Sequence, residues 1–191
     1  NYYNRKISPV NFNQEAIRPK FDQFLKDIFL DDKELIGFIQ RLLGYVAMGV
    51  PTEEIIIYLY GLGRNGKGTL VKLIIYVLGA LARTFPVEML LLQRNPLNSS
   101  APSPELANLE GVRAAIFSEI NKGRKIDSAK VKNLSGRDLI SCRKLYSNVD
   151  LQIEPTHTLL VQTNHKPEAP VDDRGLWSRT ILIPFNASFV R

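Results

Sequence analysis

The chain contains 191 residues, 45% of them hydrophobic, which is enough for one full core and a small appendage. A single cysteine, Cys142, excludes an internal disulfide and a cysteine-based zinc site, and we interpret His157 and His165 as ordinary loop or strand residues. No apolar run reaches the roughly 18–20 residues of a membrane span and no signal peptide is visible, so we expect a piece of a longer, cytoplasmic protein with no membrane partner.

The net charge of +6 is concentrated in one part of the chain. Residues 122–149 contain eight basic and two acidic side chains, and the rest of the chain is neutral on balance. One interpretation is a solvated basic face. We favour the other, a surface that binds phosphate groups, either of a nucleic-acid backbone or of a neighbour's nucleotide.

The apolar spacing predicts two helices, then strands alternating with helices. We expect helices at 19–29, 32–48, 70–79, 103–109 and 127–134, strands at 55–60, 112–117, 158–163 and 180–183, two short strands within 139–153, and a helix or turn at 176–177. This order indicates an α/β fold, with a central, mostly parallel sheet flanked by helices on both faces. The first two helices predict a helical N-terminal unit over 1–51, followed by a core over 52–191.

The run GLGRNGKGT, from Gly61 to Thr69, lies between a predicted strand and a predicted helix. This is the context of a phosphate-binding P-loop, in which glycines fold the backbone into a nest of N–H groups and the helix dipole favours an anion. Lys67 adds a mobile positive charge that can reach the outer phosphates. We therefore predict a nucleoside triphosphate site for ATP; its expected binding residues are Gly61, Gly63, Asn65, Gly66, Lys67, Gly68 and Thr69.

The residue after Lys67 departs from the usual pattern, because Gly68 stands where a Ser or Thr normally contacts Mg²⁺. Thr69 follows one place late. We expect the metal to be held mainly by water, phosphate and acidic side chains. The spelling GKGT also occurs in nucleotide kinases, so a kinase stays open as an alternative.

Two later strands end in polar residues that suit ATP hydrolysis. Glu119 follows the strand at 112–117 and can orient an attacking water or hold the metal, with Ser118 in the place of the usual aspartate as a further metal ligand. Asn164 closes the strand at 158–163, and on a strand between the other two it could touch both the water and the γ-phosphate.

Taken together, these segments resemble the superfamily 3 helicases, in particular the phage and plasmid primase-helicases and their poxvirus relative. The likeness covers nearly the whole chain. The segments that carry it are LLGY (42–45), GLGRNGKGT (61–69), AAIFSEINKGRKID (114–127), VKNLSGRDLISCRKLY (131–146), LLVQTNHKP (159–167) and DDRGLWSRTILIPF (172–185).

The resemblance implies an AAA+-like P-loop NTPase and a role for each matched residue. Lys67 and Thr69 would bind the triphosphate, Glu119 would be the Walker B carboxylate and Asn164 the sensor. The expected metal ligands are Thr69, Ser118 and Glu119. Arg179, with Arg174 as second choice, corresponds to the arginine placed near a neighbouring subunit's phosphate; a surface ion pair is an equal alternative. A DNA-gripping hairpin would contain Arg143, Lys144 and Tyr146.

We therefore expect an ATP-dependent DNA helicase or translocase motor of a viral or mobile-element replication protein. The resemblance implies a homohexamer, Mg²⁺ and ATP as cofactors, single-stranded DNA as partner, a primase domain in the same parent chain, and the host cytoplasm for a viral parent. The alternatives are a P-loop nucleotide kinase and an ATP-binding assembly module with little hydrolysis.

Overall fold

The structure is a computed structural model that describes residues 6–93, 103–143 and 150–189. Two of the predicted DNA-binding residues, Lys144 and Tyr146, lie outside these ranges.

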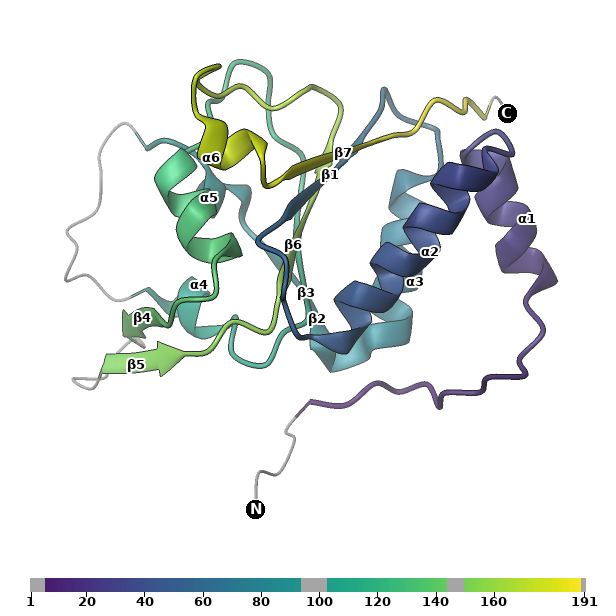
Figure 1. Cartoon of the computed structure of the whole chain (residues 1–191), viewed down its shortest axis with the longest axis horizontal. Coiled ribbons are helices and arrows are strands. Elements are labelled where there is room, and N and C mark those ends of the chain that lie inside the picture. The colour runs from purple at the N-terminus through teal and green to yellow at the C-terminus, as the bar shows by residue number, and fades with distance from the viewer. Residues whose placement is uncertain (1–5, 94–102, 144–149, 190–191) are drawn as a thin grey trace.

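The central sheet has five strands in the order β2-β3-β6-β1-β7, and every neighbouring pair in it is parallel (Figure 1). Its strands are β1 (Ile56–Tyr60), β2 (Ala82–Phe85), β3 (Ala114–Phe117), β6 (Thr158–Thr163) and β7 (Thr180–Pro184). A separate antiparallel hairpin pairs β4 (Ile140–Arg143) with β5 (Asp150–Ile153). The predicted mostly parallel sheet and the two short strands within 139–153 are therefore confirmed.

Helices cover both faces of the sheet, so its inner strands are buried on both sides. In β1, Ile56 and Tyr58 belong to one hydrophobic cluster, whereas Ile57 and Leu59 belong to the cluster on the opposite face. A strand covered on both faces carries a continuous apolar run rather than an alternating one. This explains why residues 55–60 contain no charged side chain.

One face of the sheet packs against α1 (Pro19–Ile28), α2 (Lys33–Met48) and α3 (Lys67–Leu78). Asp32 caps α2 by accepting a hydrogen bond from the backbone N–H of Leu35, and Gly49 ends the helix in the left-handed conformation. The buried side chains of α1 and α2 share one hydrophobic cluster with α3 and the sheet. The predicted division of the chain into an N-terminal unit over 1–51 and a core over 52–191 stays a prediction.

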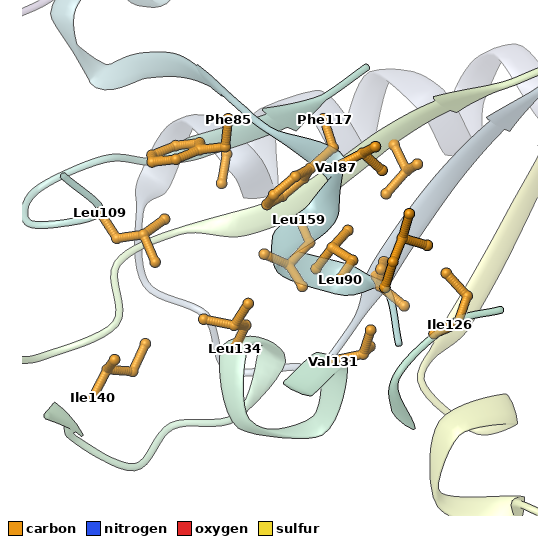
Figure 2. Close-up of a cluster of buried hydrophobic side chains, with 14 of the residues drawn as sticks. Phe85, Val87, Leu90, Leu109, Phe117, Ile126, Val131, Leu134, Ile140 and Leu159 are labelled. Carbon is orange, nitrogen blue, oxygen red and sulfur yellow. The ribbon is translucent and has the colours of Figure 1, made fainter. Parts of the chain in front are cut away.

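The other face packs against α4 (Pro104–Ala107), α5 (Ser128–Ser135) and α6 (Arg174–Trp177). Figure 2 shows the cluster of buried side chains in this layer, which includes Phe117 of β3 and Val131 of α5. Asp127 caps α5, because its side chain accepts a hydrogen bond from the backbone N–H of Lys130 at 3.2 Å. Ser103 precedes α4, but its side chain does not cap that helix. In the described part of the chain, no helix is both long and apolar enough to cross a bilayer.

His157 immediately precedes β6 and is only 2% exposed. Its Nε2 is 2.9 Å from the carbonyl oxygen of Leu134 in α5, and burial lowers the pKa of the imidazole to about 4. The ring is therefore neutral at pH 7 and fastens α5 to the sheet.

The edge strand β2 was not predicted from the sequence. Its central residues, Arg83 and Thr84, are exposed, and Pro86 follows directly after the strand. Polar side chains and a nearby proline are common on edge strands, which pair on one side only, and they conceal the apolar pattern.

Candidate active site

The loop Gly61–Gly66 connects the carboxyl end of β1 to the amino end of α3. Gly63 and Gly66 have φ angles of 102° and 88°, which residues with a side chain rarely adopt. A Cβ atom at Gly66 would also collide with the side chain of Ile28 in α1. The loop is therefore curved by its glycines, and α1 packs directly against its last residue.

We predict opposite effects on stability when Gly66 and Gly68 are replaced by alanine. Gly66→Ala should lower the free energy of unfolding by about 2–4 kcal/mol, because of the left-handed backbone and the collision with Ile28. Gly68 is helical, and a Cβ atom added there would meet no other atom within 4 Å, so Gly68→Ala should stabilise by about 0.5 kcal/mol. Urea denaturation of both variants measures the difference, and equal stabilities would contradict this loop geometry.

Lys67 begins α3 and is only 5% exposed. Its Nζ donates to the carbonyl oxygen of Gly61 and, at 3.1 Å, to Oδ1 of Asn164. Burial lowers the pKa of the ammonium group, and the negative charge of Glu119 opposes this shift. The positive charge is thus held beside the loop rather than in open solvent.

Asn164 connects Lys67 to the carboxylate predicted for catalysis. Its Nδ2 donates to Oε1 of Glu119 at 2.7 Å, while its Oδ1 accepts from Lys67. Strand β6 lies between β1 and β3, as the sequence interpretation required, so the carboxyl ends of three parallel strands bring these residues together. The outcome is one hydrogen-bonded series at one edge of the sheet.

The loop is braced by segments that are distant in sequence. Asn65 is buried, and its Nδ2 donates to the carbonyl oxygen of Phe185, just after β7. The backbone N–H of Phe189 donates to the carbonyl oxygen of Arg64 at 2.8 Å. Nothing in the local sequence marks Phe185 or Phe189 as partners of the loop, because their role depends on the pairing of β7 with β1.

The groups near the loop include backbone N–H groups of the kind that bind phosphate and side-chain oxygens of the kind that bind magnesium. Gly66 offers no side-chain cap to α3, and the first N–H groups of a helix have no partner within it. The hydroxyls of Thr69 and Ser118 and the carboxylate of Glu119 are on exposed residues. One carboxylate with hydroxyl groups fits Mg²⁺, which keeps several waters. Among the described residues, no three His, Cys, Asp or Glu side chains form a metal-binding group.

Arg179 directly precedes β7, at the amino ends of the parallel strands. The glycine-rich loop, Glu119 and Asn164 lie at the carboxyl ends, on the opposite side of the sheet. The Nη2 of Arg179 forms an ion pair with Glu54 at 2.5 Å, and its Nη1 donates to the carbonyl oxygen of Lys132 at 3.2 Å. The structure therefore does not bring Arg179 to Lys67 within one chain. Arg174 is exposed at the start of α6, and Arg143 ends β4 opposite Asp150 in the hairpin.

These features define an α/β protein whose parallel sheet presents a glycine-rich loop, a lysine, an asparagine and a glutamate at its carboxyl edge. The model of the family of unknown function DUF5906 matches residues 59–179. The chain belongs to that family, and the matched range contains the glycine-rich loop, Glu119 and Asn164.

Several viral proteins are similar to the chain in sequence. A protein named "Putative helicase L207/L206" from Acanthamoeba polyphaga mimivirus is 33% identical over 98% of this chain and 19% of its own length. "Putative helicase 022R" of Frog virus 3 is 29% identical over 87% of this chain and 17% of its own length. "Primase D5" of Fowlpox virus is 27% identical over 93% of this chain and 22% of its own length. The chain thus spans about a fifth of the length of each of these relatives.

The fold is shared with a solved structure, the apo form of the NrS-1 C-terminal region (305–718). It has a TM-score of 0.63 and 16% sequence identity, and the match covers 95% of this chain and 40% of that one. At this identity the similarity concerns the fold alone.

Proposed function

We propose that the chain is the ATP-driven motor of a viral or mobile-element replication protein, a superfamily 3 DNA helicase of the AAA+ class of P-loop NTPases. The observation that carries this proposal is the series Lys67–Asn164–Glu119 beside a glycine-rich loop. In this series the phosphate-binding Lys67 is connected to the carboxylate of Glu119 through hydrogen bonds that both residues form with Asn164. The viral relatives named helicase and primase support the same assignment.

Each residue has a separate task in this proposal. Lys67 and the amides at the start of α3 bind the β- and γ-phosphates of ATP. Glu119 accepts a proton from the attacking water, and Asn164 orients that water and the γ-phosphate. Thr69, Ser118 and Glu119 would hold Mg²⁺, and the ion would supply positive charge that neutralises the phosphates.

The wider assembly in this proposal is a homohexameric ring that moves on single-stranded DNA, with a primase domain in the same parent chain. Arg143 lies in the β4–β5 hairpin, at the side of the molecule away from α1 (Figure 1), and would contact DNA phosphates. Arg179 would approach a neighbouring subunit's phosphate only after leaving its ion pair with Glu54. Exposed Arg174 is the alternative for that role.

ATP binding by the Lys67→Ala variant tests the proposal. The variant loses a positively charged group that donates hydrogen bonds to the phosphates. ATP binding should therefore weaken on the order of 100-fold, and the rate of hydrolysis should fall with it. Lys72 lies exposed on the same helix, so Lys72→Ala is a matched control that should bind like the wild type. Calorimetric titration of the full-length protein with ATP and Mg²⁺ gives both affinities.

The reaction products separate the alternatives. Hydrolysis that increases with single-stranded DNA supports the motor. Transfer of the phosphoryl group to a second nucleotide would support a kinase, and binding without turnover would support an assembly module. Equal ATP affinities in both lysine variants would reject the site itself.

A further inference from the structure

A shallow groove of about 460 Å³ lies on one side of the glycine-rich loop. Its lining comes from α1, from the turn between α1 and α2, and from the stretch after β7; these residues are Gln23, Lys26, Asp27, Leu30, Asp31 and Phe189. Phe189 places the groove next to the loop, because its backbone N–H donates to the carbonyl oxygen of Arg64 at 2.8 Å. Ile28, which contacts Gly66, lies on another face of α1 and does not line the groove.

The order of the strands gives a direction to any nucleotide bound at the loop. Glu119 follows β3 and Asn164 follows β6, both on one side of β1 and its loop, whereas Phe189 comes after β7, on the other side. The reacting γ-phosphate must lie near the carboxylate and the asparagine. The nucleoside end must therefore leave the loop toward β7, where the groove lies.

The chemistry of the groove suits a nucleoside. The side chains of Leu30 and Phe189 are 66% and 45% exposed and offer apolar surface to a base, while the carboxylate of Asp31 can accept hydrogen bonds from ribose hydroxyls. Gln23 and Asp27 are joined by a 2.8 Å hydrogen bond and supply further polar groups.

The turn that carries two of these residues is also unusual. Leu30 and Asp31 have φ angles of 54° and 58°, in the left-handed region that residues with a side chain rarely adopt. Such strained positions concentrate at functional sites. The turn is fixed by a hydrogen bond from the N–H of Asp31 to the carbonyl oxygen of Lys26 at 2.8 Å.

We propose that this groove is the nucleoside subsite of the candidate active site, with Leu30 and Phe189 against the base and Asp31 at the ribose. The proposal rests on the proposed function, because it assumes a nucleoside triphosphate at Lys67. It assigns a ligand-binding role to α1 and to the segment after β7.

Comparison of ATP with inorganic tripolyphosphate tests this subsite separately from the phosphate site. Phe189→Ala keeps the backbone N–H that braces Arg64 and removes only the ring. We expect it to weaken ATP binding about tenfold and to leave tripolyphosphate binding unchanged. Asp31→Asn, which tolerates the left-handed backbone, should also weaken ATP alone. Phe12→Ala is the control, since Phe12 is 92% exposed and outside the groove.

Calorimetric titration of the full-length protein distinguishes the outcomes. Wild-type affinity that is equal for ATP and tripolyphosphate, or Phe189→Ala losses that are equal for both, would overturn the subsite and leave the phosphate site standing. A wild-type protein that binds neither compound, or a Lys67→Ala variant that binds both normally, would reject the proposed function itself.

Discussion

The Glu119→Gln variant should hydrolyse ATP about 10²–10⁴-fold more slowly than the wild type while binding ATP with similar affinity. Glutamine has the same shape, and its carbonyl oxygen can still accept the hydrogen bond from Asn164, so the series that begins at Lys67 is kept. What is lost is the negative charge that accepts a proton from water. Single-turnover hydrolysis and calorimetric ATP binding measure the two effects independently.

The matched control is Glu105→Gln, on exposed Glu105 of α4, which should change neither quantity. A Glu119→Gln variant with normal hydrolysis would remove this carboxylate from the reaction. Equal losses in binding and hydrolysis would mean that Glu119 positions the phosphates and the metal rather than a water.

Phe117→Ala should lower the free energy of unfolding by about 3–5 kcal/mol, the largest effect on stability that we expect. Phe117 is fully buried in β3, and its ring centroid lies 5.8 Å from that of Phe85 (Figure 2). Its removal leaves a cavity beneath the strand that carries Glu119. Because whole domains are stable by only about 5–15 kcal/mol, the variant should be close to unfolding at physiological temperature.

Urea denaturation compares this variant with Phe12→Ala, which removes the same ring from an exposed site and should leave stability unchanged. A small loss for Phe117→Ala would mean that the layer between β3 and α5 collapses to fill the space. In that case ATP hydrolysis should fall nonetheless, because Glu119 would shift with its strand.

The parts of the site that sequence analysis anticipated depend on local patterns. Glycines and a lysine between an apolar strand and a helix indicate a curved loop wherever they occur in the fold. Glu119 and Asn164 could be placed near that loop because the carboxyl ends of parallel strands meet at one edge of a sheet. The three residues form one hydrogen-bonded series, as that geometry requires.

The parts that were missed depend on contacts between distant segments. The contact of Ile28 with Gly66 and the bond from Phe189 to Arg64 follow from tertiary packing, which leaves no periodic trace in the sequence. An ion pair was one of the two alternatives for Arg179, but its partner Glu54 could not be named, because two charges that far apart in a chain show no sign of meeting. The edge strand β2 was missed because its exposed residues hide the apolar pattern.

The packing of α1 against the glycine-rich loop has a consequence for how this protein becomes competent. Ile28 supports the loop from one side and the stretch from Phe185 to Phe189 supports it from the other, yet these segments enclose nearly all of the described sequence. A chain still emerging from the ribosome can therefore fold much of its sheet before the loop has its final curvature. The loop reaches that curvature only when both flanking segments have docked.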